Sequence, residues 1–123
     1  MTGVVHSHKE LIVWQKAMDL VSEIYRATEN LPQREMYALA SQMRRAAVSV
    51  PSNIAEGRSR NSRKDFVHFL RMSYGSVSEL ETQLLISRRL SFMNEKDMEK
   101  VLPLLEEVSK MLRAMVQKLE ASP

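Results

Sequence analysis

Apolar side chains recur along nearly the whole chain at spacings of three and four residues, which is the period of an amphipathic α-helix. Four segments carry such a stripe, and they predict helices over residues 9–29, 35–57, 63–90 and 95–120. The stripes that we expect to face the core are Leu11, Trp14, Met18, Val21, Tyr25 and Thr28, then Met36, Leu39, Met43, Ala47, Val50 and Ile54, then Phe66, Phe69, Ser73, Val77, Leu80, Leu84 and Ser87, and last Met98, Val101, Leu105, Val108, Leu112, Met115 and Leu119.

Proline and glycine mark where the helices end or bend. Pro32 ends the first helix, because proline disfavours the helical conformation in the residue before it. Gly57 is expected just after the second helix, in the left-handed conformation that glycine adopts without steric cost. Pro51 lies inside the second stripe, where it removes a backbone hydrogen bond, so we expect a kink near residues 47–51, with two separate helices as the alternative. Asn61 or Ser62 is expected to cap the third helix.

Four amphipathic helices with short links pack most simply as an antiparallel up-down-up-down four-helix bundle. A chain of 123 residues corresponds to a single all-α domain, and three glycines and four prolines are too few for the turns of a sandwich or barrel. The alternative is a pair of helical hairpins that completes its core only by dimerisation.

Composition excludes several classes of protein. The chain has no cysteine, which excludes disulfides, thiolate metal sites and cysteine nucleophiles. No apolar run approaches the roughly 18 residues of a membrane-spanning helix, and residues 1–9 lack the apolar core of a signal peptide. We therefore expect a cytoplasmic protein without a membrane partner.

Candidate catalytic and metal chemistry is weak. A di-iron bundle needs two Glu-x-x-His motifs, and the nearest match is the single pair Asp65 and His68. His6 and His8 near the start of the chain form a common kind of pair that does not indicate a metal site. Phosphate-binding loops and nucleophile elbows are also missing. We expect no enzymatic activity, no cofactor and no catalytic residue.

Positive charge is concentrated in the middle of the chain. The whole protein carries +3, whereas residues 44–71 hold seven basic and two acidic side chains and carry +5. An anionic partner such as nucleic acid is expected to meet this segment first. The predicted nucleic-acid-binding residues are Arg44, Arg45, Arg58, Arg60, Arg63, Lys64 and Arg71.

Polar residues form a second stripe beside the apolar one on the second and third helices. These positions are Gln42, Arg45, Ser49, Asn53 and Glu56, and then Ser73, Ser76, Glu79 and Gln83, with Gly75 allowing close approach of the helices. The stripe is either a solvated face or a partly buried hydrogen-bond network. The network interpretation joins Asn53, Glu56, Ser76 and Glu79 and predicts that Glu56 is substantially buried, because unpaired buried polar groups are costly.

The chain resembles a known family in four stretches, LIVWQKA at 11–17, QMRRAAVSVPSNIAEG at 42–57, FVHFL at 66–70 and GSVSELE at 75–81. These look like the four-helix-bundle proteins named after 23S rRNA intervening sequences, over roughly residues 11–119. The resemblance implies an antiparallel bundle that assembles into a ring-forming homopentamer. The group is also similar to the accessory protein of diversity-generating retroelements, a basic pentameric barrel that binds nucleic acid and a reverse transcriptase.

Carried over by position, the resemblance matches Arg44, Arg45, Arg58 and Arg60 to basic positions of the motif. It matches Asn53 and Glu56 to the polar core, and it supplies no catalytic residue. Two functional hypotheses follow. The first is a non-catalytic oligomeric scaffold that binds nucleic acid, RNA or DNA and structured RNA in particular, through its basic surface. The second is an adaptor whose ring surface binds a protein partner.

Overall fold

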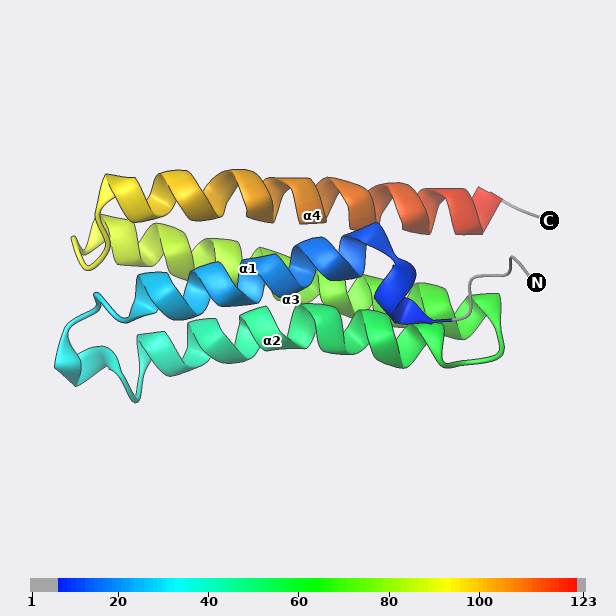
Figure 1. The fold of residues 1–123 in the computed structure, drawn as a ribbon, viewed down its shortest axis with the longest axis horizontal. Coiled ribbons are helices and arrows are strands. Elements are labelled where there is room, and N and C mark those ends of the chain that lie inside the picture. Colours follow the sequence, from blue (N-terminus) through cyan, green and yellow to red (C-terminus); the bar gives the residue numbers. More distant parts are fainter. Residues whose placement is uncertain (1–6, 122–123) are drawn as a thin grey trace.

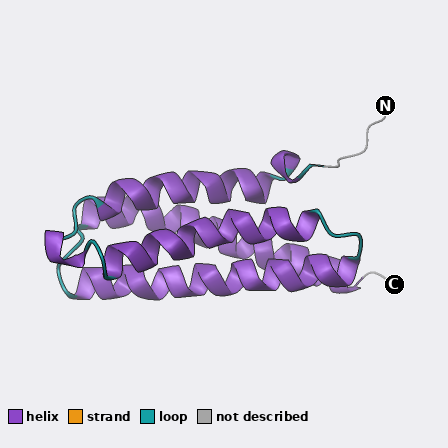
Figure 2. Cartoon of the chain, turned by 90° about the horizontal axis from the view of Figure 1, so that it is seen from below, coloured by secondary structure: helices purple, strands orange, loops and turns teal. Residues whose placement is uncertain are grey.

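The computed structural model describes residues 7–121, and the described chain consists of helices joined by short turns, without a strand. The described chain has four long helices. They lie side by side (Figures 1 and 2), and the sequence colours of Figure 1 show that successive helices run in opposite directions. The long helices are α1 (Ile12–Thr28), α2 (Leu39–Arg58), α3 (Arg63–Arg89) and α4 (Glu95–Ala121), and the short 3₁₀ helices are η1 (His8–Glu10) and η2 (Gln33–Glu35). The predicted all-α four-helix bundle is confirmed.

Each long helix contacts two others, in the cyclic order α1, α2, α3, α4. One continuous hydrophobic core fills the space between them, and one chain supplies all four sides. The α1–α2 and α3–α4 turns lie at one end of the bundle. The α2–α3 turn lies at the other end, together with the first and last described residues (Figure 1).

The stripes predicted for the last three long helices largely match the buried residues, but on α1 only Thr28 of the predicted stripe is fully buried, and the rest of the predicted face is wrong. The buried positions of α1 are Val13, Ala17, Leu20, Ile24, Ala27 and Thr28. Met18 and Tyr25 are 43% and 44% exposed, and Trp14 is only partly buried. Two apolar stripes run side by side on α1, and the stripe that contains Ala17 is the one that packs into the core.

The start of α2 also differs from the prediction. Residues 33–35 form η2, and Ala38 has φ −120° and ψ −99°, so the regular helix begins only at Leu39. The helix then continues through Pro51 without interruption, so the alternative of two separate helices is wrong. Pro103 likewise lies inside α4.

The role predicted for Gly57 is wrong and is replaced by a packing role. Gly57 is buried inside α2, and no glycine of the described chain has a positive φ. A Cβ atom at this position would lie 2.6 Å from Phe69 Cβ and 3.1 Å from Phe66 Cδ1. Glycine is therefore needed because α2 and α3 approach closely near the turn that joins them. Gly75 has no such packing constraint, since a Cβ atom added there would meet nothing within 4 Å and the residue is exposed.

Side-chain caps fix the starts of α3 and α4. The Ser62 hydroxyl accepts a hydrogen bond from the Asp65 backbone N–H at 3.0 Å, which confirms one of the two predicted caps. At the other end of the bundle, Asn94 Oδ1 accepts from the Asp97 backbone N–H at 2.8 Å. The cap at Ser62 sets where the chain reverses between α2 and α3.

Candidate nucleic-acid interface

Four of the predicted basic residues gather at the α2–α3 turn. Arg58 ends α2, Arg60 lies in the turn, and Arg63 and Lys64 open α3. Arg58 is partly buried and the other three are exposed. We call these four residues the basic end.

Two phenylalanines of α3 hold arginines of the basic end in place. The guanidinium carbon of Arg58 lies 5.9 Å from the centre of the Phe66 ring, and that of Arg60 lies 5.0 Å from the centre of Phe69. Such cation–π contacts contribute about 0.5–1 kcal/mol at exposed sites. Arg60 also donates to Glu56 at 2.8 Å, one helical turn back. The aromatic contacts restrict the arginine side chains while leaving Arg60 exposed.

The other three predicted residues do not join this cluster. Arg44 lies 14 residues before Arg58, about 21 Å along α2, where its Nε donates to Thr28 Oγ1 at 2.8 Å. Arg45 is exposed beside Ser49 on the groove between α2 and α3. Arg71, two turns into α3, forms an ion pair with Glu120 of α4. The structure therefore separates the predicted interface into a basic end and three dispersed arginines.

The predicted polar network is only partly assembled. Ser49 and Ser76 hydroxyls lie 2.7 Å apart across α2 and α3, and Asn53 Nδ2 donates to Ser49 Oγ at 3.0 Å. Asn53 and Ser76 thus meet through Ser49. Glu79 accepts instead from Gln83 of its own helix at 3.2 Å, and Glu56 pairs with Arg60.

The prediction that Glu56 is substantially buried is wrong, because half of its side chain, 51%, is exposed. The Glu56 side chain extends so that its carboxylate contacts solvent and Arg60, one helical turn away. The charge is therefore not buried, and the free-energy cost of burying it is avoided. Glu56→Ala is therefore expected to change the free energy of unfolding by less than about 0.5 kcal/mol, the usual scale for an exposed ion pair. Chemical denaturation measures this directly, and a loss above about 1 kcal/mol would contradict the placement of Glu56 at the surface.

Sequence reasoning missed Arg113 of α4, which crosses to α3. Its Nη2 donates to the Tyr74 hydroxyl at 3.4 Å. The residue lies outside the basic segment, in a helix whose sequence shows only an apolar stripe and mixed charges. Nothing in the local pattern marks it, since its position depends on how α4 packs against α3.

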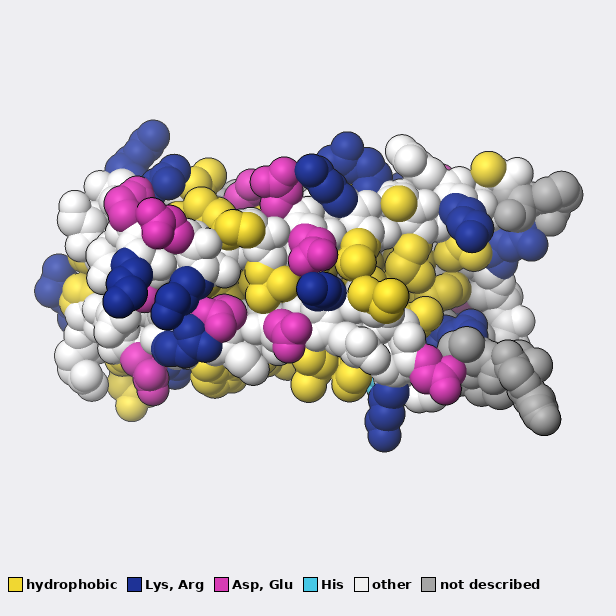
Figure 3. Space-filling model, turned by 45° about the horizontal axis from the view of Figure 1, so that its top comes forward, with side chains coloured by type: hydrophobic (Ala, Val, Ile, Leu, Met, Phe, Trp, Pro, Cys, Tyr) yellow, Lys and Arg dark blue, Asp and Glu magenta, His cyan; other side chains and the backbone are white. Residues whose placement is uncertain are grey.

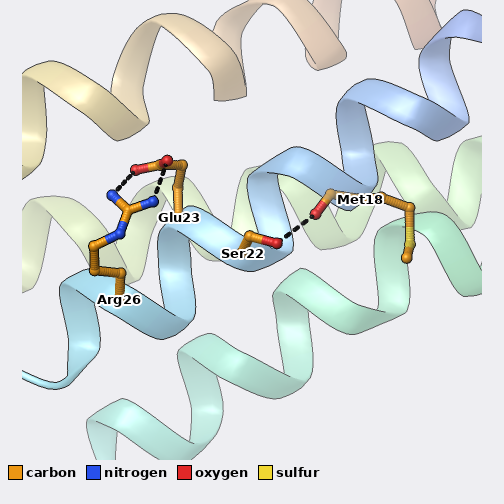
Figure 4. Close-up of polar contacts among 4 residues, drawn as sticks. All are labelled: Met18, Ser22, Glu23 and Arg26. Carbon is orange, nitrogen blue, oxygen red and sulfur yellow. Dashed lines mark hydrogen bonds and ion pairs between the residues drawn. The ribbon is translucent and has the colours of Figure 1, made fainter.

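Charges elsewhere on the bundle are largely balanced. Near the opposite end, Arg26 donates two hydrogen bonds to the carboxylate of Glu23, at 2.6 and 2.5 Å (Figure 4). The hydrogen bonds from Arg26 lower the pKa of Glu23 below its ordinary value. Figure 3 shows that acidic and basic side chains are interspersed on one lateral face, with hydrophobic side chains between them. The four residues of the basic end carry +4, whereas the whole chain carries +3, so the rest of the chain carries −1 and the surplus of positive charge is localised at the basic end.

Residues 7–121 were also searched for metal-binding groups and for membrane-spanning helices. This part of the chain holds no group of three or more histidine, aspartate or glutamate side chains placed to bind a metal ion. Its helices also include none that is long and apolar enough to cross a membrane. His6 of the predicted histidine pair lies outside the described residues.

A family model described as 23S rRNA-intervening sequence protein matches residues 9–114. The chain belongs to this family. Its fold is similar to that of a crystal structure from Bacteroides thetaiotaomicron, described as a protein with unknown function from the S23 ribosomal protein family. The TM-score is 0.79 at 22% sequence identity, and the match covers 85% of this chain and 98% of the other. A search of curated proteins found no match.

Proposed function

We propose that this member of the 23S rRNA-intervening sequence family is a non-catalytic, oligomeric scaffold that binds structured RNA in the cytoplasm through its basic end. The observation that carries the proposal is the gathering of Arg58, Arg60, Arg63 and Lys64 at one end of the bundle. The acidic side chains in the same stretch are Glu56, which is already paired with Arg60, and Asp65.

The positively charged side chains of the basic end are suited to binding phosphate groups. Guanidinium and ammonium groups bind the phosphate backbone without reading its sequence, and the released counterions make such binding strongly dependent on salt. A single bundle offers few contacts. Repetition around a ring multiplies them, because each further contact forms at high effective concentration.

Assembly is a separate prediction. Met18 and Tyr25 of α1 and Val48 of α2 are 40–44% exposed, and Tyr37 is 95% exposed. These side chains are the contacts that we propose between copies, because apolar surface that forms a continuous patch marks interaction sites. Light scattering at micromolar concentration is expected to give a multiple of 14.2 kDa, with five copies for a ring. A monomeric mass throughout the concentration range would contradict the oligomeric scaffold.

Recovery of the protein from its own cells tests the function. A tagged protein is expected to co-purify with RNA, and treatment with ribonuclease before capture is expected to remove the RNA and every protein held through it. A partner protein that remains after ribonuclease treatment, with no RNA recovered beforehand, would favour the adaptor hypothesis instead.

A further inference from the structure

A groove lies between α3 and α4, about two helical turns along α3 from the basic end. It has a volume of about 370 Å³ and is lined by Arg71, Tyr74, Gly75, Arg113 and Val116. We call it the Tyr74 groove. An aromatic ring and two guanidinium groups line it together with Val116, whereas the neighbouring groove that shares Tyr74 and Arg113 also contains Glu81 and Glu106.

The Tyr74 ring is fixed from two sides. It is partly buried against the hydrophobic core, and its hydroxyl accepts the 3.4 Å hydrogen bond from Arg113. The guanidinium carbon of Arg113 lies 6.0 Å from the ring centre. Beside the ring, Gly75 leaves open space where any other residue would place a side chain. Tyr74 and Gly75 both line the groove, so a flat group that enters it meets the exposed part of the ring beside an open helix position.

Charge in the groove favours an anionic ligand at Arg113. Arg71 is neutralised by its ion pair with Glu120. Arg113 is hydrogen-bonded to a neutral phenol, and no carboxylate within residues 7–121 forms an ion pair with it. The groove thus combines a surface for stacking with a cation for a phosphate.

The groove also lies within reach of the basic end. Lys64 and Tyr74 are ten residues apart on α3, which is about 15 Å along the helix. That distance corresponds to roughly four stacked nucleotides at 3.4 Å each. A strand whose phosphates contact the basic end can therefore continue into the groove.

From these observations we infer that the Tyr74 groove takes an unpaired nucleotide of RNA, with its base stacked on Tyr74 and its phosphate on Arg113. Aromatic stacking is the usual way in which proteins hold unpaired bases. The inference rests on the proposed function and specifies it: the basic end contacts a structured stem, and the groove receives the single strand that leaves it.

Two labelled RNA hairpins of the same stem test the inference, one blunt and one with a single-stranded uridine tail. The wild-type protein is expected to bind the tailed hairpin more tightly. Tyr74→Ala is expected to weaken binding of the tailed hairpin by about 5- to 150-fold and to leave the blunt hairpin within about twofold. Tyr74→Phe keeps the ring and is expected to retain the preference for the tail.

Gly75→Leu provides a second test that leaves Tyr74 and the core intact, because it fills the open space with a side chain. It is expected to abolish the preference for the tail, whereas Thr82→Leu, seven residues farther along α3, is expected to keep it. Equal weakening of both hairpins, or equal binding of both by the wild type, would overturn the inference about the groove. Failure of the wild type to bind either hairpin at low salt would instead overturn the proposed function.

Discussion

Replacing Arg58, Arg60, Arg63 and Lys64 together by glutamine is expected to lower the affinity for structured RNA by about 100-fold or more at low salt. Each phosphate contact releases condensed counterions, so the loss of four contacts also reduces the dependence of log affinity on log salt, by up to about three units of slope. Because the contacts are to phosphates, the loss is expected to be the same for RNAs of different sequence.

A matched variant separates this effect from a change in total charge. Glutamine at Arg34, Arg89, Lys96 and Lys100 removes the same charge from exposed residues at the opposite end of the bundle. That variant is expected to retain most of the affinity. Equal losses in the two variants would show that net charge, and not the basic end, governs binding. Thermal unfolding of both variants checks that the loss of the Arg58 and Arg60 contacts with phenylalanine leaves the fold intact.

Gly57→Ala is expected to destabilise the bundle by about 1–3 kcal/mol, even though alanine is the better helix former. The added methyl group would lie 2.6 Å from Phe69 Cβ, so α3 has to move away from α2 or the helix has to distort. The same shift would displace Phe66 and Phe69, on which the arginines of the basic end lie. Denaturant unfolding measures the stability.

Gly75→Ala is the matched control for Gly57→Ala, because it makes the same change in an open and exposed helical position. It is expected to stabilise the protein by about 0.5–1 kcal/mol through the gain in helix propensity. If both substitutions were stabilising, the close approach of α2 and α3 at Gly57 would be refuted.

The helices could be predicted from the sequence because apolar periodicity is local, and it extends over several turns in each segment. The inward face of α1 could not, since Trp14 and Met18 belong to one apolar stripe and Val13 and Ala17 to another. Which stripe faces inward depends on the space left by the other helices. The role of Gly57 was missed for the same reason, because the constraint comes from Phe69 on another helix.

For the candidate interface, sequence proximity was informative only at the turn. Arg58, Arg60, Arg63 and Lys64 come together because the chain reverses there. Arg44 and Arg71 belong to the same charged segment, but they are engaged by Thr28 and by Glu120. Those partners are distant in sequence, whereas the Glu56 partner of Arg60 lies one helical turn away, so only the packed bundle reveals the contacts of Arg44 and Arg71.

Titration of the wild-type protein with a structured RNA and a duplex DNA, at low and at physiological salt, tests the central claim most directly. Binding through the basic end predicts measurable affinity at low salt, weak preference for sequence, and a steep fall in affinity as salt increases. Absence of binding to either nucleic acid at low salt, where phosphate contacts are strongest, would contradict the account and leave the protein-adaptor hypothesis in its place.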